Sequence, residues 1–129
     1  MPDDSKLETI PVGRLGIIAM ESCTELGKKV DNYLVKWRAE RQNEHKSTIA
    51  FHGYERDSYL IDSSCPRFGS GEAKGVIRES VRGTDLYILV DVLNHSLQYK
   101  MNGVAVPMSP DDHYQDLKRI IAAVGGKAR

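Results

Sequence analysis

RFGSGEAKGVIRESVRGTDLYILVDV, residues 67–92, is the stretch that decides the fold. It contains two runs of strand-forming residues, 73–81 and 86–92, joined by a turn sequence at 82–85. The second run begins Leu-Tyr-Ile-Leu-Val, which is apolar at every position and typical of an interior strand covered on both faces. We therefore expect an α/β domain whose sheet includes these two strands.

Before this stretch the sequence predicts a strand and then a helix. Residues 13–20 form an apolar run long enough for a first strand. Ser22 and Glu25 have the spacing of a capping box, so we expect a helix that begins there and runs to about Asn43. Its apolar residues share one helical stripe, which we expect to pack on the sheet: Leu26, Val30, Tyr33, Leu34 and Trp37.

Residues 44–66 carry weaker signals. A short strand fits 48–51, an exposed turn fits 52–57, and a strand over 58–64 would end before Pro66. We expect this segment to form a hairpin or a loop between the first helix and the deciding stretch.

After the second run, Asn102-Gly103 predicts a tight turn. A second helix should begin with Ser109 as its cap and Pro110 at its first position, and Gly125-Gly126 should end it. Its apolar stripe consists of Leu117, Ile120, Ile121 and Val124. We interpret the basic residues 127–129 as the helix exit. The parallel strand that an α/β pattern would place next is missing, so we expect a free sheet edge and an oligomer.

The composition indicates one soluble domain without a long-range electrostatic field. Eighteen Lys and Arg balance eighteen Asp and Glu, which argues against nucleic acid or a membrane as a partner. No apolar run is long enough to cross a membrane, and residues 1–12 are polar, so we expect a flexible arm and a cytoplasmic protein. Cys23 and Cys65 are expected to be reduced and buried.

Two motifs in this sequence resemble those of one enzyme family. Phe68-Gly-Ser-Gly-Glu72 and Glu79-Ser-Val-Arg-Gly-Thr-Asp85 are similar to the Phe-Ser-Asp-Gly-Glu and Glu-Ser-Val-Arg-Gly-x-Asp motifs of the ribose-phosphate pyrophosphokinases (PRPP synthetases). Weaker similarity continues at 111–117 and 125–129, so the resemblance covers roughly the second half of the chain. It implies a partial phosphoribosyltransferase-type sheet with flanking helices, in which residues 1–129 are an incomplete N-terminal domain.

The resemblance implies a ribose-phosphate diphosphokinase, which transfers the terminal diphosphate of ATP to ribose 5-phosphate with Mg²⁺ and gives PRPP and AMP for nucleotide biosynthesis. The family takes its metal-binding histidine, its basic flexible loop and its acidic ribose-phosphate loop from later segments, which this sequence does not contain. We therefore expect no catalytic residue and no magnesium ligand here, and no activity from these 129 residues alone. The resemblance also implies a homo-oligomer.

The same resemblance assigns an adenine-binding site to Phe68, Ser70 and Glu72, which in the family reach the active site of a neighbouring subunit. An aromatic face can stack on a purine, and a hydroxyl or carboxylate can accept a hydrogen bond from the exocyclic amine. Ser70 stands where the family usually has Asp or Asn. The alternative is that residues 69–71 are a simple turn before a strand, with Phe68 in the core.

Ser80 and Arg82 match positions that bind a regulatory phosphate in some family members. A hydroxyl and a guanidinium two residues apart on an extended chain point to the same side and can share one anion. The alternative is that Arg82 pairs with Glu79 or Asp85 at the strand ends.

Two other functions are left open by the sequence. The chain could be a non-catalytic module that joins full-length synthetases through the same subunit contacts. It could also be a small nucleotide-binding α/β domain whose motifs match by coincidence. Asp111-Asp112-His113 could be interpreted as a metal cluster, although acidic residues at a helix start are explained by the helix dipole.

Overall fold

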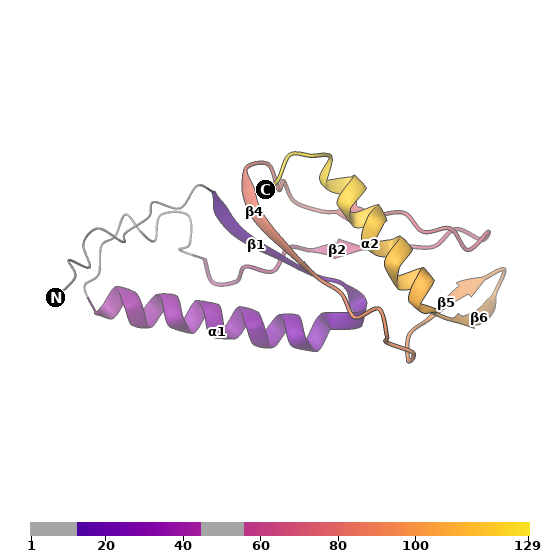
Figure 1. Cartoon of the computed structure of the whole chain (residues 1–129), viewed down its shortest axis with the longest axis horizontal. Helices are drawn as coiled ribbons and strands as arrows, with labels where there is room; N and C mark the ends of the chain where they lie inside the picture. The colour runs from indigo at the N-terminus through magenta and orange to yellow at the C-terminus, as the bar shows by residue number, and fades with distance from the viewer. Residues whose placement is uncertain (1–12, 45–55) are drawn as a thin grey trace.

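The computed structural model describes residues 13–44 and 56–129. The arm predicted for 1–12, the strand predicted at 48–51 and most of the turn predicted at 52–57 lie outside these residues. Helices and small parallel and antiparallel sheets make the described part a mixed α/β domain, as predicted (Figure 1). The elements are β1 (Arg14–Ala19), the 3-10 helix η2 (Glu21–Cys23), α1 (Thr24–Asn43), β2 (Ser63–Ser64), β3 (Val76–Ile77), β4 (Thr84–Leu89), β5 (Gln98–Met101), β6 (Val104–Pro107) and α2 (Pro110–Val124).

The parallel sheet is built on β1. On one side, every residue of β1 is in parallel register with a residue of β4. On the other side, the Ile17 amide donates to the Tyr59 carbonyl and the Ile61 amide donates to the Ile17 carbonyl, each at 2.8 Å. The strand predicted at 58–64 is therefore an extended segment beside β1 that continues into the two-residue β2.

The last residues of the chain lie along the outer edge of β4. The Arg129 amide donates to the Thr84 carbonyl at 2.9 Å, and the Leu86 amide donates to the Arg129 carbonyl at 2.8 Å. This alternation is the hydrogen-bond pattern of a parallel pair. Residues 127–129 therefore follow the end of α2 as predicted and in addition pair with β4, so this part of the sheet edge is not free.

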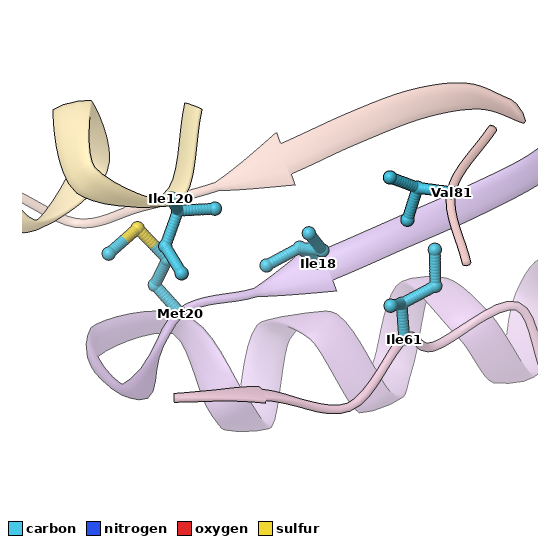
Figure 2. Packing of buried hydrophobic residues seen from close by; sticks show 5 residues of the cluster. All are labelled: Ile18, Met20, Ile61, Val81 and Ile120. Atoms are coloured by element: carbon cyan, nitrogen blue, oxygen red, sulfur yellow. The ribbon is translucent and has the colours of Figure 1, made fainter. Parts of the chain in front are cut away.

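The two helices cover opposite faces of β1, because successive strand residues point to opposite sides. On one face α1 approaches so closely that a Cβ atom at Gly27 would lie 2.3 Å from the Cβ of Ala19. On the other face Ile18, which is fully buried, belongs to the same core cluster as Ile120 of α2. Figure 2 shows the buried members of this cluster: Ile18, Met20, Ile61, Val81 and Ile120.

The predicted apolar stripe of α1 is wrong for three of its five members. Leu26, Tyr33 and Trp37 are each more than half exposed, at 54%, 60% and 56%. The helix instead buries Gly27 and Asp31, which are spaced i and i+4. A glycine in the contact lets the helix backbone lie directly against the strand, so the large apolar side chains lie outside the contact.

β4 is covered on one face by the described residues. Leu86 and Ile88 pack against the core cluster, whereas Tyr87 between them is 63% exposed. The prediction of a strand covered on both faces is therefore wrong for this part of the chain. β4 also begins earlier than predicted, because a hydrogen bond from the Thr84 amide to the Val81 carbonyl (3.0 Å) closes the preceding turn sooner.

Two further local predictions are wrong. Ser22 does not form the predicted capping box: its hydroxyl accepts from the Asp91 amide at 2.9 Å, and α1 begins after η2. The strand predicted at 73–81 is reduced to the two residues of β3. Continuing the β2–β3 register would pair 79–81 with 59–61, but the Leu60 amide, which would donate across this pair, donates to the Ser58 hydroxyl at 3.2 Å.

The capping chemistry predicted for α2 is confirmed. The Asp112 amide donates to the Ser109 hydroxyl at 3.1 Å, and the Ser109 amide donates to the Asp112 carboxylate at 2.9 Å. Gly125 ends the helix in the left-handed conformation, with φ of 64°. The apolar stripe is narrower than predicted, because Ile120 is buried while Ile121 is 53% exposed. Across the described ranges, none of the helices combines the length and apolarity needed to cross a membrane.

β5 and β6 form the hairpin that the Asn102-Gly103 turn signal indicates. Both residues have positive φ, 50° and 81°. Positive φ at both central positions is the requirement of a type I′ turn, and Asn-Gly is the preferred sequence for it. The hairpin is an antiparallel pair that joins β4 to α2.

Candidate functional site

The predicted adenine motif forms the end of a β-hairpin whose arms start at β2 and β3. Farther out, Arg67 and Ala73 form an antiparallel bridge, and the Phe68 amide donates to the Glu72 carbonyl at 2.8 Å. We call residues 68–72 the tip loop. In Figure 1 this hairpin projects from the same side of the domain as the β5–β6 hairpin.

The tip loop carries the three predicted adenine-contacting residues on the surface. Phe68 is 55% exposed, and Ser70 and Glu72 are also exposed. The Gly71 amide donates to the Phe68 carbonyl at 2.9 Å, and its φ of 89° is one that glycine adopts readily. The alternative in which Phe68 fills the core is excluded by its exposure. An aromatic face beside a hydroxyl and a carboxylate can stack on a purine and hydrogen-bond its edge.

The β5–β6 hairpin supports the tip loop from below. A Cβ atom at Gly71 would lie 3.0 Å from the sulfur of Met101 and 3.6 Å from the ring of Tyr99. A Cβ atom at Gly69 would lie 3.4 Å from the side-chain oxygen of Asn102. Only the contact at Gly71 is tighter than an ordinary van der Waals contact, so Gly71 allows the loop backbone to pack closely on the second hairpin.

A buried ion pair lies at the base of the tip loop. Nη2 of Arg67 lies 2.8 Å from Oδ2 of Asp116, and the two side chains are 10% and 7% exposed. Nη1 of Arg67 donates to the Gly71 carbonyl at 3.0 Å. The guanidinium carbon lies 4.4 Å from the centre of the Tyr99 ring. One guanidinium thus joins the tip loop, the β5–β6 hairpin and α2.

The electrostatics of Asp116 show what this pair contributes. Burial raises the pKa of the Asp116 carboxyl, and the guanidiniums of Arg67 and Arg119 offset this effect only in part. Because the folded-state pKa lies above the unfolded value, the contribution of Asp116 to stability decreases as the pH rises through that folded-state pKa. Burial of the carboxylate therefore offsets part of the stability that the ion pair contributes.

Sequence reasoning missed Arg67, Tyr99 and Asp116. The contact between Arg67 and Asp116 joins residues 49 positions apart, which no local pattern reports. One signal was available: Asp116 lies four residues before Ile120, on the buried side of α2. A carboxylate at that position in a helix indicates a buried partner of opposite charge.

Ser80 and Arg82 lie away from the tip loop, on the segment that leads into β4. Both are exposed and flank the buried Val81, and the Arg82 amide donates to the Ser80 hydroxyl at 3.4 Å. Arg82 takes part in none of the ion pairs found within the described ranges, so its alternative pairing with Glu79 or Asp85 is not formed there. Their binding of a regulatory phosphate stays a prediction.

A cavity of about 260 Å³ lies between the carboxyl end of β1 and α2. The residues that line it include Ser63, Cys65, His113 and Asp116. Burial, and then the nearby charge of Asp116, raises the pKa of the Cys65 thiol to about 11. Burial likewise raises the pKa of Cys23. Both thiols are therefore protonated and weakly nucleophilic at neutral pH.

Cys65 should react slowly with iodoacetamide in the folded chain. A pKa of about 11 instead of 9.0 leaves about 100-fold less thiolate at pH 8 than in the unfolded chain, and the thiolate is the reactive form. Alkylation of a Cys23→Ser variant, followed by mass spectrometry, measures Cys65 alone. The rate should increase as the pH rises toward 11 and increase sharply in urea. Cys23 is buried as expected, whereas Cys65 is only partly buried. Equal rates in folded and unfolded chains at pH 8 would contradict this partly buried environment of Cys65.

The described residues do not fit a magnesium site. Residues 13–44 and 56–129 contain no cluster of three or more His, Cys, Asp or Glu arranged to hold a metal ion. In the Asp111-Asp112-His113 run, Asp112 caps α2, and Nε2 of the buried His113 lies 2.7 Å from the Asn94 carbonyl. We therefore assign no chemical step in this chain to the Mg²⁺ that the resemblance implies.

Comparison with known proteins gives one match. Residues 15–128 match the family model described as the N-terminal domain of ribose phosphate pyrophosphokinase. Searches of curated proteins and of solved structures gave no match. The family match extends through β1 and α1, beyond the half of the chain in which the motifs alone show the resemblance. The chain therefore belongs to the ribose-phosphate pyrophosphokinase family and corresponds to its N-terminal domain.

Proposed function

We propose that this chain supplies the adenine-contacting surface of a ribose-phosphate diphosphokinase, which transfers the terminal diphosphate of ATP to ribose 5-phosphate. The observation that carries the proposal is the 55% exposed Phe68 on a loop that both Arg67 and the β5–β6 hairpin contact. Proteins hold bases by stacking them on exposed aromatic rings, which is worth about 1–3 kcal/mol per base. ATP is the nucleotide that the resemblance to the family implies.

Each residue of the tip loop has a distinct role in this proposal. Phe68 stacks on the adenine, while Ser70 and Glu72 accept hydrogen bonds from its exocyclic amine. The loop projects from the domain, which suits contact with the active site of a neighbouring subunit in a homo-oligomer (Figure 1). Ser80 and Arg82, on a separate surface, are proposed to bind a regulatory phosphate.

Phe68→Ala should weaken ATP binding by about tenfold, since the stacking surface is lost. Equilibrium titration of the chain with ATP measures this change. Tyr33→Ala is the matched control, because Tyr33 is an equally exposed aromatic residue on α1. The wild-type chain should also release no AMP from ATP and ribose 5-phosphate, because the segments to which the resemblance assigns catalysis are not among these 129 residues.

Two outcomes would contradict the proposed function. ATP affinity that is identical in the wild type and in Phe68→Ala would remove the tip loop from nucleotide binding. Clear AMP release by these 129 residues would show that the chain is itself a catalyst, so that its role is larger than an adenine-contacting surface.

A second candidate is a non-catalytic module that assembles with longer members of the family. It is favoured by large apolar side chains left on the surface of α1 and β4, namely Leu26, Tyr33, Trp37 and Tyr87. Such a module should co-purify with a full-length synthetase, and Trp37→Glu should abolish the association. Failure of the wild-type chain to associate would remove this candidate.

A further inference from the structure

The hydrogen bonds within the tip loop do not orient it relative to the rest of the domain. We call the contacts of the Arg67 guanidinium with Gly71, Asp116 and Tyr99 the brace. The bonds from the Phe68 amide to the Glu72 carbonyl and from the Gly71 amide to the Phe68 carbonyl close the turn on itself. Neither bond fixes the direction in which the loop projects from the domain. Phe68 is 55% exposed, so its ring gains little orientation from packing.

Arg67 is the side chain that ties this loop to the domain body. Its guanidinium donates to Gly71 inside the loop at 3.0 Å and to Asp116 in α2 at 2.8 Å. The same group lies over the Tyr99 ring of the β5–β6 hairpin at 4.4 Å. Arginine suits this position because its planar fork can donate in two directions while its face stacks on an aromatic ring.

Arg67 is not itself placed to bind the nucleotide. Its side chain is 10% exposed, and its guanidinium already donates to a carbonyl and a carboxylate. A phosphate group would have to displace Asp116, which is also buried. Any effect of Arg67 on ligand binding must therefore pass through the conformation of the loop.

We propose that Arg67 is a positioning residue, which holds the tip loop on α2 and the β5–β6 hairpin so that Phe68 and Glu72 are preoriented for a purine nucleotide. This inference rests on the proposed function of the loop. A loop that is already ordered loses less conformational freedom when its ligand binds, so the brace strengthens binding without touching the ligand.

The test compares variants that separate loop position from overall stability. Arg67→Met removes the brace. The double variant Arg67→Met/Asp116→Leu removes both partners of the 2.8 Å pair and leaves only Arg119, whose side chain is 20% exposed, without its carboxylate. Arg119→Met is the matched control: Arg119 lies 3.5 Å from the same carboxylate of Asp116 and is not part of the tip loop. Arg67→Lys retains the charge but cannot reproduce both hydrogen bonds and the stacking.

Amide hydrogen exchange is the first measurement. In the double variant, exchange at Phe68 and Gly71 should be about tenfold faster than in the wild type, whereas exchange at Ile17 in β1 should be unchanged. Arg67→Lys should show an intermediate increase, and Arg119→Met should match the wild type at Phe68 and Gly71. Wild-type exchange of the loop in the double variant would overturn the proposal, as would equal loosening in Arg67→Met and Arg119→Met.

ATP titration of the same variants is the second measurement. The double variant should bind ATP about tenfold more weakly than Arg119→Met, although both remain folded. If the wild-type chain binds no ATP, the proposed function fails, while the exchange data still decide whether Arg67 positions the loop. If ATP binds and the double variant retains full affinity, the positioning role is overturned and the proposed function stands.

Discussion

Asp116→Ala should lower the free energy of unfolding by about 3 kcal/mol or more, which is typical of breaking a buried ion pair. The loss arises from Arg67, whose guanidinium would be left buried without its carboxylate, at 10% exposure. Urea unfolding monitored by circular dichroism measures the change. Asp111→Ala is the control, because Asp111 is an exposed carboxylate in the same helix.

Replacing both partners should recover most of that stability. Arg67→Met/Asp116→Leu removes both partners of the closer pair and leaves only Arg119, whose side chain is 20% exposed, without its carboxylate. Buried ion pairs are often replaced by apolar residues at little cost. The raised pKa of Asp116 agrees with this expectation, because burial of the carboxyl opposes its ionisation and offsets part of its attraction to the guanidiniums. If Asp116→Ala is as stable as the wild type, or if the double variant is no more stable than Asp116→Ala, this account of the pair is wrong.

Ile120→Ala should lower the free energy of unfolding by about 3 kcal/mol, because the side chain is 1% exposed and its removal leaves a cavity in the core cluster. Ile120 is the buried residue through which α2 joins the cluster around Ile18 (Figure 2). Ile121→Ala is the matched control, since the neighbouring isoleucine is 53% exposed and should change stability by less than about 0.5 kcal/mol. Equal losses of stability in the two variants would contradict the observation that α2 buries Ile120 and exposes Ile121.

Local chemistry made several elements predictable. β1 appears within the predicted 13–20, and α1 ends at the predicted Asn43. The capping box at Ser109 and the left-handed Gly125 bound α2 as expected. In each case the signal and the structure depend on residues within a few positions of one another.

Contacts between distant segments decided the features that the sequence did not predict. The buried face of α1 follows from the approach of Gly27 to β1, and residue size along the helix does not report this contact. Tyr87 is exposed because the described residues place nothing over that face of β4. An apolar run indicates that a strand can be covered, whereas the packing of other segments decides whether it is.

The candidate site also has one part that adjacent residues determine and another part that contacts between distant segments determine. The motif at Phe68 is consistent with the exposed loop that the structure shows, which depends on adjacent residues. The brace was not predictable, because Arg67, Tyr99 and Asp116 meet only when the hairpins and α2 pack together. The support for a binding residue often lies far from it in the sequence, even when the residue itself belongs to a motif.

The most direct test of the central claim is fluorine NMR of Phe68 during titration with ATP. The chain contains two phenylalanines, so labelling with 4-fluorophenylalanine gives two resonances, and Phe51→Tyr assigns them. A stacked purine should shift the Phe68 resonance progressively as ATP increases, whereas ribose 5-phosphate alone should not. A Phe68 resonance that does not move up to about 10 mM ATP, which is about ten times a weak Kd of about 1 mM, would contradict the adenine-contacting role.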